Sequence, residues 1–218
     1  MKAVLISIQP KWCELIANGK KTIEVRKSRP KLETPFKCYI YCTIGNGVKG
    51  DYLVPSGIQC GKVIGEFVCD RIDEYGAEFT ELQYPDACDK NVSLNSIKRV
   101  EFDEEADEPF YRYETSNEEY NPDDCKFLKE SCLTFNEVRQ YIGETCYDKH
   151  FYGWHITDLK IYDKPKELSE FSPICRFKGG RCKLCLFYEE AFGGCCATVT
   201  RPPQSWGYVE ELKELQNG

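Results

Sequence analysis

The 218-residue sequence has no apolar run long enough to cross a membrane. A membrane-spanning helix needs about 18 to 20 consecutive apolar residues, whereas the N-terminal apolar run extends only from Val4 to Ile8. That run is also shorter than the apolar region of a secretory signal, and no small-residue cleavage site follows it. These absences predict a cytoplasmic protein with no membrane partner.

The sequence also lacks an overall positive charge. Its formal net charge is −7, which argues against indiscriminate binding to nucleic acid, because attraction to phosphates requires basic residues. The charge is unevenly distributed, however. Residues 1–37 carry nine Lys/Arg against three acids, whereas residues 101–124 carry eleven acids and one arginine. We interpret this acidic insertion as a solvated loop, with a flap that repels phosphate as the alternative.

Neither an internal repeat nor a low-complexity tract is present, and apolar periodicity predicts the elements. Strands are predicted at residues 2–8, 22–27, 36–44, 62–72 and 151–163. Short helices are predicted at residues 10–18, from Asn121 onward, and from the Thr134 capping box to Gly143. The acidic region is predicted to be irregular until Asn121. This pattern is typical of an α+β protein in which short helices flank a small, mostly antiparallel, partly open β-barrel.

The segment GKKTIEVR at residues 19–26 carries three charged residues at close spacing, Lys21, Glu24 and Arg26. Glu24 and Arg26 are two apart on a predicted strand, so both side chains can point into one cleft. Lys21 precedes the strand, where a loop can direct its ammonium at a phosphate or a reacting carbonyl. Arg26 can bind a phosphate or a base edge through two parallel hydrogen bonds. The alternative is a surface ion-pair ladder, which would contribute little stability.

The pattern G-x-K-x-x-E-x-R, at Gly19, Lys21, Glu24 and Arg26, closely resembles the signature of the ASCH superfamily. The order of elements over residues 1–165 supports the same resemblance. It implies a PUA-like β-barrel domain over residues 1–165, followed by a cysteine-rich extension over residues 166–218. It also implies that a basic cleft at the motif binds nucleotide or RNA.

Some ASCH proteins are amidohydrolases that remove the acetyl group from acetylcytidine nucleosides, and others are described as ribonucleases. Hydrolysis in the same cleft is therefore the alternative function. The amidohydrolases use a lysine, a threonine and a glutamate, and the resemblance places these at Lys21, Glu24 and Glu130. Because a carboxylate replaces the threonine hydroxyl, the implied reaction uses a water activated by Glu24 and an oxyanion stabilised by Lys21. Thr22 is one candidate for a substituted hydroxyl.

Two tyrosines of the 36–44 strand, Tyr39 and Tyr41, share a face and could stack on bases. The alternative is that they are core residues, as most aromatic side chains in strands are. His155, one of only two histidines, lies in the last predicted strand. We interpret it as a hydrogen-bonded core or rim residue rather than a catalytic one.

Fourteen cysteines in a cytoplasmic protein are expected to be thiols or metal ligands rather than disulfides. Nine are scattered between Cys13 and Cys146, and five follow the pattern C-x6-C-x2-C-x9-C-C between residues 175 and 196. Glycine pairs beside this pattern are typical of small zinc sites. The predicted zinc ligands are Cys175, Cys182, Cys185 and either Cys195 or Cys196.

Two other readings of the cysteine-rich extension stay open, a redox dithiol at Cys182 and Cys185 and unpaired thiols. The extension could also bind a protein partner. Phage and bacterial ASCH proteins with a similar tail end in an R-P-P-Q-S-W segment, which stands here at residues 201–206. The resemblance therefore implies a bacterial or phage type.

Overall fold

The computed structural model describes residues 1–44, 57–81, 92–103, 108–116, 126–143, 149–174 and 197–212. The chain forms two compact units, each built from separate stretches of sequence. Unit 1 comprises residues 1–17, 35–68 and 158–218, and unit 2 comprises residues 18–34 and 69–157. Both units draw on residues before residue 165, and the predicted boundary between an N-terminal domain and a cysteine-rich extension stays a prediction.

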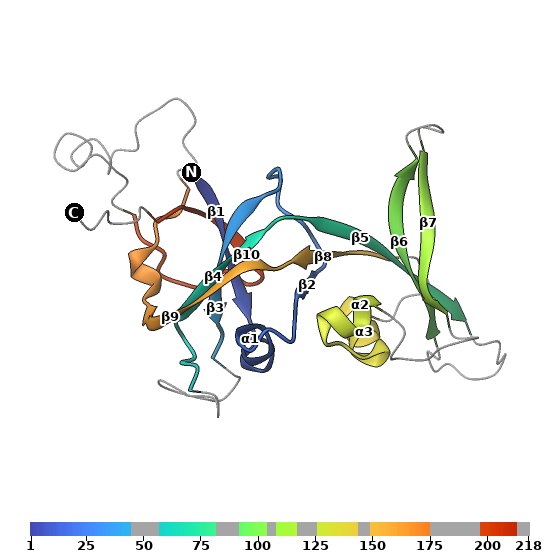
Figure 1. Cartoon of the computed structure of the whole chain (residues 1–218), viewed down its shortest axis with the longest axis horizontal. Helices are drawn as coiled ribbons and strands as arrows, with labels where there is room; N and C mark the ends of the chain where they lie inside the picture. The colour runs from blue at the N-terminus through green and yellow to red at the C-terminus, as the bar shows by residue number, and fades with distance from the viewer. Residues whose placement is uncertain are drawn as a thin grey trace. The chain divides into compact units, whose positions relative to one another are not determined.

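Unit 1 is built on a five-stranded sheet (Figure 1) with the order β10-β1-β3-β4-β9. Its strands are β1 (Lys2–Ile8), β3 (Phe36–Cys42), β4 (Val63–Cys69), β9 (Thr157–Lys166) and β10 (Trp206–Glu210). β1 runs parallel to β3 and antiparallel to β10. The predicted strands at 2–8 and 36–44 are confirmed, whereas β10 was not predicted. The segment that follows R-P-P-Q-S therefore belongs to the sheet of unit 1.

The core of unit 1 covers most of β1 and β3. Every residue of β1 after Lys2 is buried, and the core cluster joins both strands to residues from the C-terminal part of the chain. Its members are Ala3, Leu5, Tyr39, Tyr41, Val63, Phe171 and Val209. Helix α1 (Pro10–Ala17) begins at Pro10, as predicted, and buries Cys13 and Ile16. A 3-10 turn, η1 (Leu168–Glu170), precedes Phe171, whose ring meets that of Tyr39 edge-on at 4.9 Å.

Unit 2 is built on a second five-stranded sheet with the order β2-β8-β5-β6-β7. Its strands are β2 (Ile23–Arg26), β5 (Ile72–Glu81), β6 (Val92–Asp103), β7 (Glu108–Ser116) and β8 (Lys149–His155). All four neighbouring pairs are antiparallel. Helices α2 (Lys126–Ser131) and α3 (Phe135–Ile142) complete the unit. The Thr134 capping box is confirmed, since Thr134 Oγ1 accepts from Glu137 N at 3.2 Å and Glu137 Oε2 accepts from Thr134 N at 2.9 Å.

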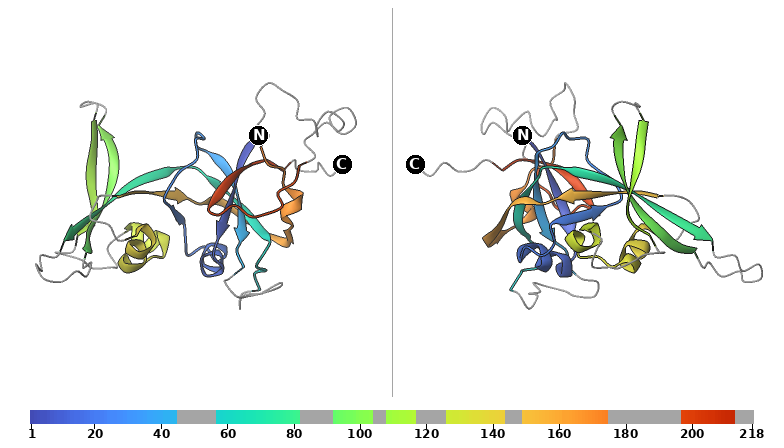
Figure 2. Two further views of the ribbon diagram at one scale, coloured as in Figure 1. Left: turned by 180° about the vertical axis from the view of Figure 1, so that it is seen from behind. Right: turned by 45° about the vertical axis from the view of Figure 1, so that its right-hand side comes forward.

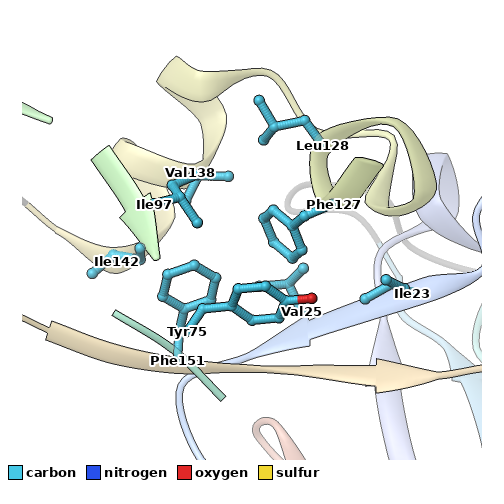
Figure 3. Packing of buried hydrophobic residues seen from close by; sticks show 9 residues of the cluster. All are labelled: Ile23, Val25, Tyr75, Ile97, Phe127, Leu128, Val138, Ile142 and Phe151. Atoms are coloured by element: carbon cyan, nitrogen blue, oxygen red, sulfur yellow. The ribbon is translucent and has the colours of Figure 1, made fainter. Parts of the chain in front are cut away.

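An aromatic cluster joins the two helices of unit 2 to its sheet (Figure 3). The rings of Tyr75 and Phe151 stack with centroids 5.4 Å apart, and Phe127 from α2 lies 4.4 Å from Tyr75. Ile23 and Val25 of β2 belong to the same cluster. Position 153 requires glycine, because a Cβ there would lie 2.9 Å from the Tyr75 ring. The cluster thus fixes which side of β2 faces the core.

Three details of the predicted secondary structure are wrong. The acidic segment does not form one irregular loop, because residues 101–103 end β6 and residues 108–116 form β7, paired as a ribbon (Figure 2). The aromatic residues scattered among its acids favour strand pairing despite the charge. The predicted strand at 62–72 is interrupted between β4 and β5, and the predicted strand at 151–163 is interrupted at Ile156 between β8 and β9.

The fold class is α+β with mostly antiparallel pairing, as predicted. The two sheets are consistent with the partly open β-barrel that the sequence predicts. Among the strands within the described ranges, both sheets are open, and β1 with β3 is a parallel pair. The two strand interruptions allow one run of sequence to supply strands to both sheets.

Candidate functional site

Strand β2 places Glu24 and Arg26 on the side opposite its core residues. Ile23 and Val25 pack into the aromatic cluster, and side chains alternate along a strand. β2 pairs with β8 in a register that sets Glu24 opposite Trp154 and Arg26 opposite Tyr152. Because β2 ends the strand order of its sheet, its charged side chains lie on an edge strand of unit 2.

The three motif residues form one charged cluster around the Glu24 carboxylate. Its Oε1 lies 2.9 Å from Nη2 of Arg26, and its Oε2 lies 3.5 Å from Nζ of Lys21. The Lys21 ammonium also donates to the Ser131 carbonyl oxygen at 2.6 Å. The exposed fractions are 2% for Lys21, 5% for Glu24 and 7% for Arg26. The structure therefore gathers the three predicted residues, but it buries them where an open pocket was expected.

The end of helix α2 holds Lys21 in this position. Ser131 is the last residue of α2, and the terminal carbonyls of a helix attract cations because they lack partners inside the helix. Glu130 O accepts a hydrogen bond from Thr22 N at 2.8 Å. Gly19, with a φ of +73°, supplies the turn before the motif. The chain around Lys21 is thus fixed by backbone hydrogen bonds as well as by charge.

Burial changes the protonation of the cluster. Desolvation lowers the pKa of Lys21 below 10.5 even though the Glu24 carboxylate opposes this change. Burial also raises the pKa of Tyr141 on helix α3, partly offset by the charge of Arg26. Lys21 therefore releases its proton more readily than an ordinary lysine does.

Two basic residues that follow the motif in sequence, Lys27 and Arg29, each lie over an aromatic ring of unit 2. Lys27 Nζ is 5.2 Å from the centroid of Tyr141, and Arg29 Cζ is 5.7 Å from that of Tyr152. The exposed basic residues of this stretch are Lys20, Lys27, Arg29 and Lys31. A hollow of about 800 Å³ is lined by residues 29–34 and Ile72. Unit 2 thus presents basic side chains beside the buried cluster.

Sequence reasoning missed Ser131 and Tyr141. Ser131 contributes its backbone carbonyl. Every residue has such a group, so the amino-acid type could not indicate this contact. Tyr141 lies next to the core residue Ile142 on α3 and is 37% exposed. An aromatic side chain outside the apolar stripe of a helix was the signal that could have indicated it.

The remaining predicted site residues lie elsewhere. The Glu130 carboxylate pairs with Lys126 at 3.8 Å, while its backbone carbonyl contacts the motif. Tyr39 and Tyr41 are 0% and 5% exposed in the core of unit 1, and the Tyr39 hydroxyl accepts from Leu212 N at 2.9 Å. Since a stacking platform needs an open ring face, the structure assigns these two tyrosines to the core.

His155 belongs to a hydrogen-bonded polar network on the sheet of unit 2. Its Nε2 lies 2.8 Å from Asp73 Oδ2. Asp73 Oδ1 is also 3.2 Å from Arg71 Nε and 3.3 Å from Arg99 Nη2. Burial raises the pKa of Asp73, but the hydrogen bond from His155 and the nearby positive charges outweigh it and lower that pKa. This network satisfies the charge of a buried carboxylate.

Within the described ranges, no group of His, Cys, Asp and Glu residues is arranged to hold a metal ion. The predicted zinc ligands Cys175, Cys182, Cys185, Cys195 and Cys196 lie outside the described residues. The zinc site therefore stays a prediction. No helix among the described residues is long and apolar enough to span a membrane.

Comparisons with known proteins place the chain in a family. Solved structures that resemble it include an ASCH protein from Zymomonas mobilis, with 16% identity, a TM-score of 0.47, and coverage of 96% of this chain and 88% of that one. Two single-substitution variants of that protein match at 16% identity, with TM-scores of 0.46 and 0.47, 96% and 97% of this chain covered, and 89% and 92% of theirs. No match was found among curated proteins. The model of the ASCH domain family matches residues 6–166, and the chain therefore belongs to the ASCH domain family.

Proposed function

We propose that the chain binds nucleotide or RNA at a site centred on Lys21, Glu24 and Arg26. The observation that supports this most strongly is that two basic side chains share one carboxylate in a buried position. Burying charge is costly unless each charge is compensated. The Lys21 ammonium and the Arg26 guanidinium lie at one carboxylate, so an anionic group such as a phosphate could contact both cations at once. Membership in a family with an RNA-binding-like fold agrees with this assignment.

The donor and acceptor groups of the cluster suit both a phosphate and a base edge. A guanidinium offers two parallel N–H groups to a phosphate or to the acceptors of a base. The Oε2 atom of Glu24 is buried, and the Lys21 ammonium lies 3.5 Å from it, which is longer than an ordinary hydrogen bond. It is therefore suited to accept an amino or imino hydrogen of a base. A small movement that opens the cluster would precede binding, because all three side chains are buried.

The surroundings supply attraction and stacking. The exposed cations Lys20, Lys27, Arg29 and Lys31 attract phosphates over a longer range than direct contact. Tyr141 and Tyr152 lie beneath Lys27 and Arg29. Each ring could exchange its cation for a base, since base–aromatic stacking tolerates any sequence. This arrangement favours a single-stranded ligand, whose bases are unstacked and accessible.

Fluorescence anisotropy with labelled short RNAs and nucleotides tests the proposal. Arg26→Lys keeps the charge but removes the bidentate fork, so affinity should fall about tenfold, as loss of one good bidentate contact predicts. Lys27→Ala should weaken binding. It should also reduce the slope of the logarithm of the binding constant against the logarithm of the salt concentration by about 1, as loss of one phosphate contact predicts. Lys164→Ala is the matched control, because it removes an exposed lysine from unit 1. The proposal is wrong if no nucleotide or RNA binds at low salt, or if Arg26→Lys binds as the parent does.

A second candidate function is hydrolysis in the same site. It is favoured by the position of the Lys21 ammonium, which lies 3.5 Å from the Glu24 carboxylate. Glu24 would accept a proton from a water that attacks an acetylated cytidine or an RNA phosphodiester, and Lys21 would stabilise the negative charge that develops. Chromatographic analysis of the products decides between binding and turnover. A hydrolase should lose turnover but retain binding in Glu24→Gln, whereas a binder shows no product in either form.

A further inference from the structure

Three buried cysteines of unit 1 come together outside the site proposed above. Cys13 lies on α1, Cys42 ends β3, and Cys60 precedes β4. Each is 0% exposed. The sulfur atoms of Cys42 and Cys60 are 3.6 Å apart, which is van der Waals contact. The Cys13 thiol donates to the Ile8 carbonyl oxygen at 3.5 Å, and its side chain also interacts with that of Cys42.

Backbone hydrogen bonds hold Cys42 and Cys60 in this position. Cys42 N donates to Lys62 O at 2.9 Å, and Gly61 N donates to Cys42 O at 2.7 Å. Cys42 is therefore bonded to both residues that follow Cys60. Gly61, with a φ of +82°, allows the chain to turn there. A disulfide has an S–S length of about 2.05 Å, so the two sulfurs need to approach by only about 1.5 Å to become bonded.

The two thiols differ in acidity. Hydrogen bonding with Cys13, and to a smaller extent with Cys60, lowers the pKa of Cys42 and outweighs the effect of burial. The pKa of Cys60 is raised to about 12, first by burial and then by its contact with Cys42. Cys42 is therefore the more acidic thiol of the pair, and Cys60 is the one that holds its proton more tightly. A thiolate beside a protonated thiol is the arrangement of an attacking cysteine and its resolving partner.

We propose that Cys42 and Cys60 form a peroxide-reactive dithiol that closes to an intramolecular disulfide. The Cys42 thiolate attacks one oxygen of hydrogen peroxide, the O–O bond breaks, and the hydroxide that leaves takes up a proton to become water. Cys60 then loses its proton and attacks the sulfur of the Cys42 sulfenic acid, and a second water leaves. Two thiols and one peroxide thus become one disulfide and two waters. This inference does not depend on the proposed function.

The burial of all three thiols limits the size of the oxidant that can react with them. Because all three residues are 0% exposed, an oxidant reaches the sulfurs only when the structure opens locally, and hydrogen peroxide needs a smaller opening than an aromatic or peptide disulfide does. Treatment with peroxide should therefore oxidise the pair faster than an aromatic disulfide reagent does. A cysteine exposed on the surface would show no such preference for the small oxidant.

Peptide mapping of the folded full-length chain tests the proposal. After peroxide treatment, free thiols are alkylated in denaturant and the protein is digested with trypsin. Cleavage at Lys37, Lys49 and Lys62 places Cys42 on peptide 38–49 and Cys60 on peptide 50–62. We expect these two peptides to appear joined, two hydrogen atoms lighter than their sum, and to separate on treatment with a dithiol reductant.

Single variants assign the bond. Cys42→Ser should abolish the joined peptides, although Cys38 remains on the same peptide. Cys60→Ser should leave a Cys42 sulfenic acid that dimedone traps. Cys69→Ser is the matched control, because burial raises the pKa of Cys69 to about 12 and its thiol contacts the Arg71 carbonyl. It should not change the joined peptides.

The unmodified protein alone suffices to refute the proposal, should a variant fail to fold. Recovery of both Cys42 and Cys60 as alkylated thiols, while other cysteines of the folded chain are oxidised, overturns it. A disulfide from Cys60 to Cys38 overturns it as well.

Discussion

Replacing Glu24 with glutamine should destabilise unit 2 severely, because it leaves two buried cations without their shared anion. The carboxylate lies 2.9 Å from Arg26 Nη2 and 3.5 Å from Lys21 Nζ. At an effective dielectric constant of about 20, these distances correspond to attractions of roughly 6 and 5 kcal/mol. Removing the carboxylate also removes its desolvation cost, so the net loss is smaller. Loss of one member of a buried ionic cluster typically costs about 3–5 kcal/mol, and we expect a value in this range.

Urea unfolding followed by tryptophan fluorescence measures this loss. Trp154 is fully buried and lies opposite Glu24 in the β2–β8 register. Trp12 and Trp206 belong to unit 1, so the measurement uses a chain with both replaced by phenylalanine, in which the emission of Trp154 reports on unit 2. Glu33→Gln removes an exposed carboxylate from the same unit and should change the free energy of unfolding by less than about 0.5 kcal/mol. The double variant Lys21→Met with Glu24→Gln should recover part of the loss, because only one buried cation remains.

A loss below about 1 kcal/mol in Glu24→Gln would match a surface ion pair rather than a buried one. The same loss in the single and double variants would also refute the reasoning, because the two cations would then not depend on the shared carboxylate. The binding and turnover assays with Glu24→Gln need conditions under which the fluorescence of Trp154 shows the variant to be folded.

Three further predictions concern stability. Thr134→Ala should cost about 1 kcal/mol in urea unfolding, because it removes the hydroxyl that caps Glu137 N. Gly65→Ala should cost about 1–3 kcal/mol and lower the melting temperature, because the new Cβ would lie 2.5 Å from Lys160 O. For Lys21, the folded pKa lies below the unfolded value near 10.5, so the unfolded state binds more protons between these values and stability should rise with pH there. Lys21→Met should abolish that rise in unfolding curves measured from about pH 8 to about pH 10.

Much of the local structure follows from short-range preferences. Alternation over residues 22–27 and the +73° φ of Gly19 are enough to bring Glu24, Arg26 and Lys21 to one place. The capping box at Thr134 likewise needs only residues three apart. Such features depend on the chain within one turn or a few residues, so the amino-acid types carry the information directly.

The burial of side chains and the pairing of strands depend on segments that are far apart in the chain. Tyr39 alternates as a half-exposed strand residue would, yet β3 lies between β1 and β4 and is buried on both faces. The pairing of β10 with β1 joins residues about two hundred positions apart, and no local sequence pattern predicts this pairing. The many acids led to the prediction of a loop for the end of β6 and for β7, although the aromatic residues among them favour strand pairing.

The amino-acid types of the motif thus determine which charged groups meet, because strand period and a glycine turn act over a few residues. Whether those groups are open or buried is decided by the tertiary structure, which sets the backbone carbonyl of Ser131 against Lys21. The same holds for the thiols of Cys42 and Cys60, which are 18 residues apart in sequence and 3.6 Å apart in space. Desolvation and non-local contacts set the protonation of these groups, and both arise only when distant segments pack together.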